Sequence, residues 1–128
     1  MGLEIGLRGS ASMRVTPETT AEAWGSGDVP VFGTPSLVAL LETASVNAVA
    51  KHLGPGETTV GTWLDVSHLA ATPVGLEVRA EAELIAIEGR KLIFTAVAHD
   101  TREKIGECRH HRVIVARERF LAKIQAKQ

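Results

Sequence analysis

The sequence predicts an α+β protein in which a long antiparallel sheet wraps around one buried helix. Two observations predict this architecture. Nearly every residue between Phe32 and Ala50 is apolar or small and follows helical spacing. From Glu57 to Val115, apolar and polar residues instead alternate as they do in strands. One early helix followed by several long strands is typical of an α+β fold with helices on one face of the sheet.

The N-terminal part predicts short, irregular elements. Residues 3–15 are expected to form an extended lead-in and a first strand, because apolar and polar side chains alternate toward the end of this segment. Thr16 and Pro17 are typical of a capped helix start, so residues 17–24 are expected to form a short helical turn. The glycine-rich residues 25–28 predict a flexible loop that serves as a lid or only as a connector.

The main helix is expected between Phe32 and Leu53. Thr34 has a hydroxyl that can cap the first free amides, and Pro35 suits the first helical position. The run 54–56, Gly-Pro-Gly, ends the helix. The expected buried stripe comprises Leu37, Leu41, Ala44 and Ala48. Because a helix that is apolar on most sides needs more cover than one small sheet gives, the sequence also predicts a homodimer.

Four strands are expected after the helix. Their predicted ranges are 57–70, 76–88, 91–100 and 105–116. In the first of them, period two would place Val60, Thr62, Leu64 and Val66 on one face, and in the second it would place Leu76, Val78, Ala80 and Ala82 inward. Gly89 and Arg90 predict a tight hairpin turn, and residues 117–127 predict a short terminal helix.

The composition narrows the class of protein. The 128 residues are expected to form one domain, 1–128, with 45% hydrophobic and 23% charged residues, as in ordinary globular proteins. A net charge of −1 and only three Phe, two Trp and no Tyr argue against nucleic-acid binding. The single cysteine, Cys108, excludes a disulfide within the chain and a cysteine metal cluster. No membrane-spanning run or signal peptide is evident, so a cytoplasmic location is expected, and no cofactor is implied.

Glu42 is the only ionisable residue between Phe32 and Ala50. It lies on the same helical stripe as Val38 and Val46, which predicts a partly buried carboxylate. Burying a carboxylate costs several kcal/mol unless a partner or a function offsets the cost. A solvated helix face would explain Glu42 without any function, but no other charge defines such a face. We therefore single out Glu42 as a candidate functional residue.

His68 and Thr34 are two further candidates. His68 ends a predicted strand, follows Val66 onto the inward face by period two, and precedes a Pro-Gly turn. Thr34 could be only a helix cap, but a hydroxyl at a helix N-terminus can also hold a carbonyl oxygen or an anion. Thr34 and Glu42 are eight residues apart, about 12 Å along a straight helix, so they could line two ends of one acyl pocket. A histidine, a glutamate and a threonine suit assisted hydrolysis.

The remaining histidines and basic residues give weaker signals. His110 and His111 are adjacent on a strand, so their side chains point to opposite faces and cannot chelate one metal ion. No metal site is therefore expected. Arg109 to Arg112, together with Arg90 and Lys91, form a basic cluster in the sequence. This cluster indicates either a solvated strand face or a landing site for the phosphates of a nucleotide-like ligand.

The segments 32–44, 60–75, 87–100 and 109–115 resemble the fluoroacetyl-CoA thioesterase-like family of hot-dog-fold thioesterases. The similarity runs from about Met13 to Lys127, and its most specific part is the histidine that precedes Ala-Ala-Thr-Pro. The resemblance implies a hot-dog fold, a dimer with active sites at the subunit interface, and hydrolysis of acyl-CoA thioesters. It would make Thr34, Glu42 and His68 the catalytic residues.

The same resemblance implies further roles. Gly61 would lie with its backbone against the acyl group, and Arg112 would lie on the CoA side. Glu42 would act as nucleophile or base, His68 would activate water, and Thr34 would act across the subunit interface. Gly25 and Asp28 stand roughly where the resemblance implies a phenylalanine-bearing lid in the fluoroacetyl-specific members. The absence of phenylalanine at these two positions argues against selectivity for a fluorinated acyl group.

Two other functions fit the same fold. One is a non-catalytic module that binds CoA or acyl-CoA, because fold does not fix function. Glu42 and His68 argue against it, since a pure binder need not bury an ionisable pair. The other is an enoyl-CoA hydratase or dehydratase with an Asp-His pair. Asp65 and His68 are three residues apart on a strand and face opposite sides, which argues against that function.

Overall fold

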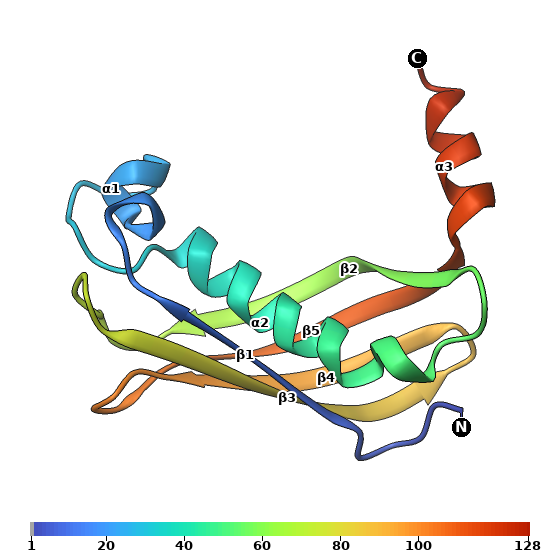
Figure 1. Cartoon of the computed structure of the whole chain (residues 1–128), viewed down its shortest axis with the longest axis horizontal. Coiled ribbons are helices and arrows are strands. Elements are labelled where there is room, and N and C mark those ends of the chain that lie inside the picture. The colour runs from blue at the N-terminus through green and yellow to red at the C-terminus, as the bar shows by residue number, and fades with distance from the viewer. Residues whose placement is uncertain (1) are drawn as a thin grey trace.

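The structure is a computed structural model that describes residues 2–128, and it consists of one curled sheet with a long helix against one face (Figure 1). In chain order the elements are β1 (Arg8–Arg14), the 3-10 turn η1 (Pro17–Thr19), α1 (Ala21–Trp24), α2 (Thr34–Val49), the 3-10 turn η2 (Ala50–His52), β2 (Glu57–His68), β3 (Glu77–Glu88), β4 (Lys91–His99), β5 (Lys104–Ala116) and α3 (Arg117–Gln125). Within residues 2–128, no helix is long and apolar enough to cross a membrane.

The five strands form one antiparallel sheet in the order β1-β3-β4-β5-β2. Helix α2 packs mainly on β1 and β3, and α1 lies beside the N-terminal end of α2 (Figure 1). Helix α3 continues from β5 and projects away from the sheet (Figure 1). The predicted helix against an antiparallel sheet is therefore confirmed.

The core lies between α2 and the inner face of the sheet. The four predicted residues of the α2 stripe, Leu37, Leu41, Ala44 and Ala48, are all buried. Val78, Ala80 and Ala82 of β3 meet this helix, as their period-two spacing predicts. Full burial of one aliphatic side chain contributes about 1.5–3 kcal/mol to folding, so this layer fixes the position of α2 on the sheet.

Strand β1 approaches α2 closely enough to leave no room for a side chain at one position. A Cβ atom on Gly9 would lie 2.2 Å from the backbone nitrogen of Ala48. One residue later, the side-chain amide of Asn47 donates a hydrogen bond to the carbonyl oxygen of Ser10 at 2.8 Å. The first strand thus holds the C-terminal half of α2 in place.

The inward face predicted for β2 is only half correct. A β-bulge leaves Thr62 unpaired, because Gly61 pairs with Arg112 and Trp63 pairs with His111. One extra residue reverses the direction of the side chains before it, so Thr59 rather than Val60 is buried. Leu64 and Val66 pack on the core as expected. The bulge also brings Gly61 to the helix side of the strand.

The ends of the elements were predicted with varying success. The first strand begins at Arg8, after a turn at Gly6 with φ of 101°, which agrees with the lead-in and strand predicted for residues 3–15. The α-helix ends at Val49 and continues as a 3-10 turn, not as a helix to Leu53. The later strands, the Gly89–Arg90 hairpin and the terminal helix agree with the prediction within about two residues, the usual uncertainty of element ends.

Candidate functional site

The start of α2 and the end of β2 meet at Thr34 and His68. Gly33, in an extended conformation, is the residue that caps α2, so Thr34 is already helical and its hydroxyl is not used as a cap. Instead, the Thr34 Oγ1 atom lies 2.8 Å from His68 Nδ1. The two segments are held together nearby by a hydrogen bond from the Phe32 amide to the Thr72 carbonyl. The capping role that the sequence suggested for Thr34 is therefore wrong.

The His68 ring has one nitrogen that is buried and free. Its Nε2 atom has no hydrogen-bond partner among the described residues. Burial lowers the pKa of His68 below its ordinary value, and the Ala70 backbone opposes this shift more weakly. At neutral pH the imidazole is therefore neutral, and a nitrogen without a partner can take a proton or hold a water molecule.

Glu42 lies eight residues after Thr34 on α2, where its side chain contacts β5 and β2. Its Oε2 atom accepts a hydrogen bond from Arg112 Nη1 at 3.3 Å, and its side chain is 38% exposed. The predicted partly buried carboxylate is confirmed. A Cβ atom on Gly61 would lie 2.8 Å from the same oxygen, so only glycine leaves the carboxylate in this position. Glu42 therefore combines a fixed charge partner with an accessible oxygen.

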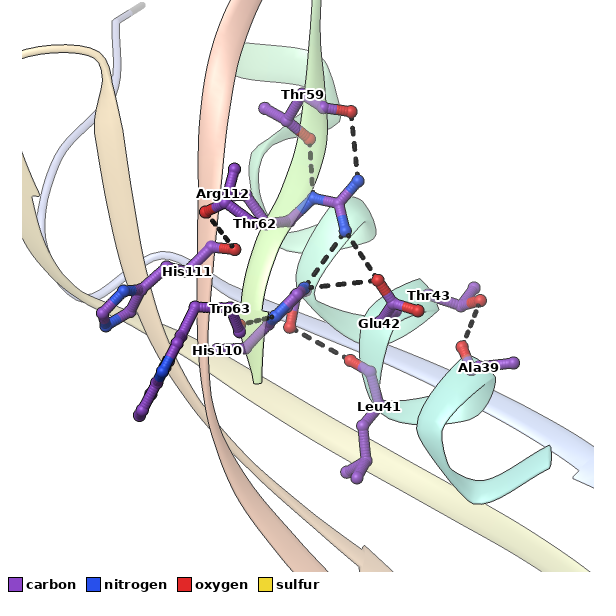
Figure 2. A network of polar contacts seen from close by, with 11 residues as sticks. Ala39, Leu41, Glu42, Thr43, Thr59, Thr62, Trp63, His110, His111 and Arg112 are labelled. Atoms are coloured by element: carbon purple, nitrogen blue, oxygen red, sulfur yellow. Dashed lines mark hydrogen bonds and ion pairs between the residues drawn. The ribbon is translucent and has the colours of Figure 1, made fainter. Parts of the chain in front are cut away.

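Arg112 is buried behind Glu42 and is held by Thr59 (Figure 2). Its Nε atom donates to Thr59 Oγ1 at 2.8 Å, and its Nη2 atom donates to the Thr59 carbonyl at 3.0 Å. Burial lowers the pKa of Arg112, and the charge of Glu42 opposes that shift. A guanidinium stays protonated in proteins, so it supplies a permanent positive charge beside the carboxylate.

Within one chain, the predicted site residues form two separate groups. Thr34 and His68 lie at one end of α2, and Glu42, Gly61 and Arg112 lie further along it. No hydrogen bond or ion pair in residues 2–128 joins the two groups, which the helix separates by about 12 Å. The structure thus brings together the members of each group but not the groups themselves.

The basic cluster predicted around Arg112 is divided between the two faces of β5. Arg112 and His110 are buried on the helix side, whereas Arg109 is exposed. His111 stacks on Trp63 with ring centroids 4.4 Å apart. Arg90 pairs with Glu57 at 3.1 Å. The residues of this cluster therefore do not form one continuous basic surface for phosphates, because adjacent strand residues alternate in direction.

His110 and Thr59 were missed as neighbours of Glu42. His110 Nε2 lies 3.1 Å from Arg112 Nη1, and Thr59 holds the other edge of the same guanidinium. Counting back two residues from Arg112 would have found His110. Counting by two along the predicted inner face of β2 does not find Thr59, because the bulge reverses the direction of the side chains before Trp63.

Other candidate sites do not compete with these residues. Burial raises the pKa of the Cys108 thiol to about 11, so it stays protonated and is a poor nucleophile at neutral pH. In residues 2–128, no three His, Cys, Asp or Glu side chains are grouped to hold a metal ion. A hollow of about 450 Å³ lies between β5 and α3, away from every predicted site residue. Its lining includes Arg119, Phe120 and Lys123 of α3 but none of the predicted site residues.

Comparison with known proteins identifies relatives along nearly the whole chain. Residues 15–118 match the family described as fluoroacetyl-CoA-specific thioesterase. The fluoroacetyl-CoA thioesterase of Streptantibioticus cattleyicolor is 39% identical over 132 residues, which covers 98% of this chain and 95% of that protein.

Solved structures give the same relationship. A crystal structure of the fluoroacetyl-CoA-specific thioesterase FlK with one substitution is 38% identical, with a TM-score of 0.91 over 100% of this chain and 99% of the other. A thioesterase superfamily member from Thermus thermophilus is 27% identical, with a TM-score of 0.89 over 96% of this chain and 91% of the other. These likenesses confirm the hot-dog fold expected from the sequence.

Proposed function

The chain belongs to the fluoroacetyl-CoA-specific thioesterase family, and from this premise we propose that it hydrolyses a small acyl-CoA thioester with Thr34, Glu42 and His68. Its class is thioester hydrolase, since a named thioesterase is similar over its whole length. The net reaction adds water across the C–S bond and gives a free carboxylic acid and the CoA thiol. The binding-module and hydratase alternatives have no comparable support.

One observation carries the assignment of the residues. The Glu42 side chain is partly exposed and its Oε2 atom lies against the backbone of Gly61, while a buried arginine holds its charge in place. Such a carboxylate can attack the thioester carbonyl or remove a proton from the attacking water. If Glu42 attacks, an anhydride between Glu42 and the acyl group forms as the C–S bond breaks, and water then cleaves this anhydride and regenerates the carboxylate. If Glu42 acts as a base, it takes a proton from the water that adds to the carbonyl, and the C–S bond of the adduct then breaks. In both routes the departing CoA thiolate takes up a proton. The Gly61 backbone would then lie along the acyl group.

His68 and Thr34 supply the second half of the proposed chemistry. The free Nε2 atom of His68 would take a proton from water, and the Thr34 hydroxyl at Nδ1 fixes the orientation of the ring. Thr34 also stands in the first turn of α2, where backbone amides lack partners within the helix. These amides would stabilise the developing negative charge on the thioester oxygen. Arg112 would act at the CoA side by holding the charge of Glu42.

We propose that the two groups meet across a homodimer. Strand β2 is a 12-residue edge strand that carries both Gly61 and His68. Long unpaired edge strands are normally covered in native proteins. Helix α2 packs mainly on β1 and β3, so a second copy can approach the β2 side of the inner face. Thr34 and His68 of one protomer would then face the partner's Glu42, which removes the separation along α2.

The acyl group is proposed to be small and not specifically fluorinated. Gly25 and Asp28 are the residues of the lid segment that replace the expected aromatics. Gly25 has φ of 74° and ends α1, so it contributes a turn without a side chain. Gly25 and Asp28 themselves offer no aromatic ring that could tell fluoroacetyl from acetyl groups.

The remaining expectations are also proposals. We propose that residues 1–128 act as one domain in the cytoplasm, and that neither nucleic acid nor a membrane is a partner. The reaction as proposed uses no cofactor and no metal ion, because the Glu42 carboxylate supplies the nucleophile or base and the His68 imidazole activates water.

Thiol release from a panel of short acyl-CoA thioesters tests the proposal. Glu42→Gln and His68→Ala are each expected to lower kcat by about 10²–10⁴-fold, the usual contribution of a positioned acid or base. Glu81→Gln and His99→Ala are the matched controls, because both residues are exposed on the strands. Wild-type rates in the two site variants, or no release from any thioester by the native enzyme, would overturn the proposal.

A further inference from the structure

His110 is buried beside Glu42, and the proposed chemistry does not use it. Only 1% of its surface is exposed. Its Nδ1 atom lies 2.9 Å from the carbonyl oxygen of Trp63, across the β5–β2 pair. Its Nε2 atom lies 3.1 Å from Arg112 Nη1, as Figure 2 shows. Both ring nitrogens thus have partners, in contrast to those of His68.

These two partners fix the protonation state of the ring. A carbonyl oxygen only accepts, so His110 Nδ1 must carry a hydrogen and donate it to Trp63. A guanidinium only donates, so His110 Nε2 must be unprotonated and accept from Arg112. Both contacts demand the same neutral tautomer. His110 is therefore not a proton carrier here but a hydrogen-bond acceptor at a defined position.

A single nitrogen of Arg112, Nη1, connects His110 to Glu42. Arg112 Nη1 carries two hydrogens, one directed at His110 Nε2 and the other at Glu42 Oε2 at 3.3 Å. Thr59 holds the opposite edge of the guanidinium through Nε and Nη2. Four of the five N–H groups of Arg112 are thus engaged, which fixes its plane and the direction of the bond to Glu42.

We propose that His110 is a positioning residue for thioester hydrolysis, which as a neutral acceptor aligns Arg112 and through it the carboxylate of Glu42. The inference rests on the proposed function, because it assigns His110 a role only through Glu42. If the carboxylate turns away from the substrate, the reaction slows steeply, because a displacement of about 1 Å can lower the rate by 10²-fold.

The charges around His110 are consistent with a neutral ring. Burial lowers the pKa of His110, the hydrogen bond to the Trp63 carbonyl opposes this shift, and the Arg112 charge adds to it. Glu42 on α2 opposes it from 3.7 Å, beyond hydrogen-bond distance, and His111 on β5 contributes weakly. From β2 the ring meets the uncharged Trp63 carbonyl, and from β4 it meets the Phe94 ring at 6.3 Å. A protonated Nε2 would point a hydrogen at Arg112, which has no acceptor to offer.

Two substitutions separate positioning from structural support. His110→Gln carries an amide oxygen far enough from the backbone to accept from Arg112, but it loses the donor to Trp63. His110→Asn keeps a donor near the Nδ1 position and cannot reach Arg112. With a short acyl-CoA thioester, His110→Asn is expected to lower kcat by about 10–100-fold with little change in KM. His110→Gln is expected to restore most of the lost kcat.

A purely structural role predicts the opposite pattern. Then kcat would follow the midpoint of thermal unfolding, and the two variants would lose activity together. Equal losses in both, or a wild-type kcat in His110→Asn, would overturn the inference. His99→Asn is the matched control, because His99 is exposed near the end of β4. If Glu42→Gln is inactive while His110→Asn is fully active, the inference fails and the proposed function stands.

The native enzyme offers a second measurement that needs no variant. Long-range ¹H–¹⁵N correlation spectra distinguish protonated from unprotonated imidazole nitrogens. At neutral pH, His110 is expected to show a protonated Nδ1 and an unprotonated Nε2. A ring protonated at Nε2, or at both nitrogens, would contradict the acceptor role even if every variant failed to fold.

Discussion

At the scale of single residues, the missing side chain of Gly61 shapes the space around Glu42. A Cβ atom there would lie 2.8 Å from Glu42 Oε2, 3.2 Å from His110 Cε1 and 3.3 Å from Arg112 Nη1. The last two groups are buried and held by hydrogen bonds, so the more exposed carboxylate must move. The backbone of β2 therefore sets the position of the proposed reactive oxygen.

Gly61→Ala is expected to lower kcat by about 10–100-fold, because the Glu42 carboxylate must shift by tenths of an ångström or more. The midpoint of thermal unfolding should change little, since the displaced carboxylate is partly solvated. Gly2→Ala is the matched control, with nothing within 4 Å of its added atom. Unchanged steady-state kinetics in Gly61→Ala would mean that the carboxylate is not used where the structure has it.

The sequence predicted the surroundings of some of the site residues but not of all. The isolation of Glu42 among apolar residues correctly predicted a partly buried carboxylate. Thr34 satisfied the rule for a helix cap, yet Gly33 takes that position and releases the hydroxyl to His68. A cap and a side-chain partner use the same hydroxyl, and tertiary contacts decide between them. His110 was not singled out as a neighbour of Glu42, because it lies in the basic run from Arg109 to Arg112.

At the scale of elements, β1 approaches α2 most closely at Gly9. A Cβ atom on Gly9 would meet only backbone atoms of α2, at 2.2 Å from Ala48 N and 2.5 Å from Ala44 O. Backbone atoms of a packed helix cannot rotate away as a side chain can. The position of α2, and with it that of Glu42, thus depends on this glycine.

Gly9→Ala is expected to reduce the free energy of unfolding by about 3 kcal/mol, at the upper end of the usual cost of overpacking. Denaturant titration measures the change. Ser10→Ala should have little effect, because Ser10 uses its backbone carbonyl, not its side chain, to bind Asn47. Similar stabilities of the two variants would show that the helix can move away from the strand.

Alternation predicted which segments are strands better than it predicted their faces. Period two along β3 correctly gave Val78, Ala80 and Ala82 as inward residues. Along β2 the same rule failed before Trp63, because the bulge at Thr62 adds a residue without disturbing the apolar pattern. A bulge is decided by pairing with the neighbouring strand, which the local sequence does not specify. Gly61 and Thr59 were therefore assigned to the wrong face.

At the scale of the whole molecule, the buried His110 and the partly buried His68 make stability depend on pH. Burial lowers the pKa of both His68 and His110 below the value of about 6.5 in an unfolded chain. Below that pH, the unfolded chain binds protons that the folded chain does not. The stabilisation is therefore complete above the unfolded pKa and is lost as the pH falls through the folded pKa.

The free energy of unfolding is expected to fall between pH 7 and pH 5, as measured by denaturant titration at each pH. Replacing His110 by Gln should reduce the slope, because one of the two linked groups is removed. His99→Asn should leave the slope as it is, since His99 is exposed. A stability that stays constant or increases as the pH falls over this interval would contradict the neutral state of the two rings.

The proposed dimer depends on contacts between two chains. Helix and strand patterns predict the fold of a protomer, because they depend on contacts within it. The proposed meeting of Thr34 and His68 with Glu42 requires a second copy, and no local spacing encodes that approach. The expected composite site follows from the separation of about 12 Å along α2 and from the long edge strand β2.

Purified mixed dimers test this composite site most directly. One subunit would carry Glu42→Gln and the other Thr34→Ala with His68→Ala, each with its own affinity tag. Neither homodimer should hydrolyse an acyl-CoA thioester, but the mixed dimer contains one intact site and should show about half of the wild-type activity. A mixed dimer that is folded and inactive would contradict a site shared between subunits.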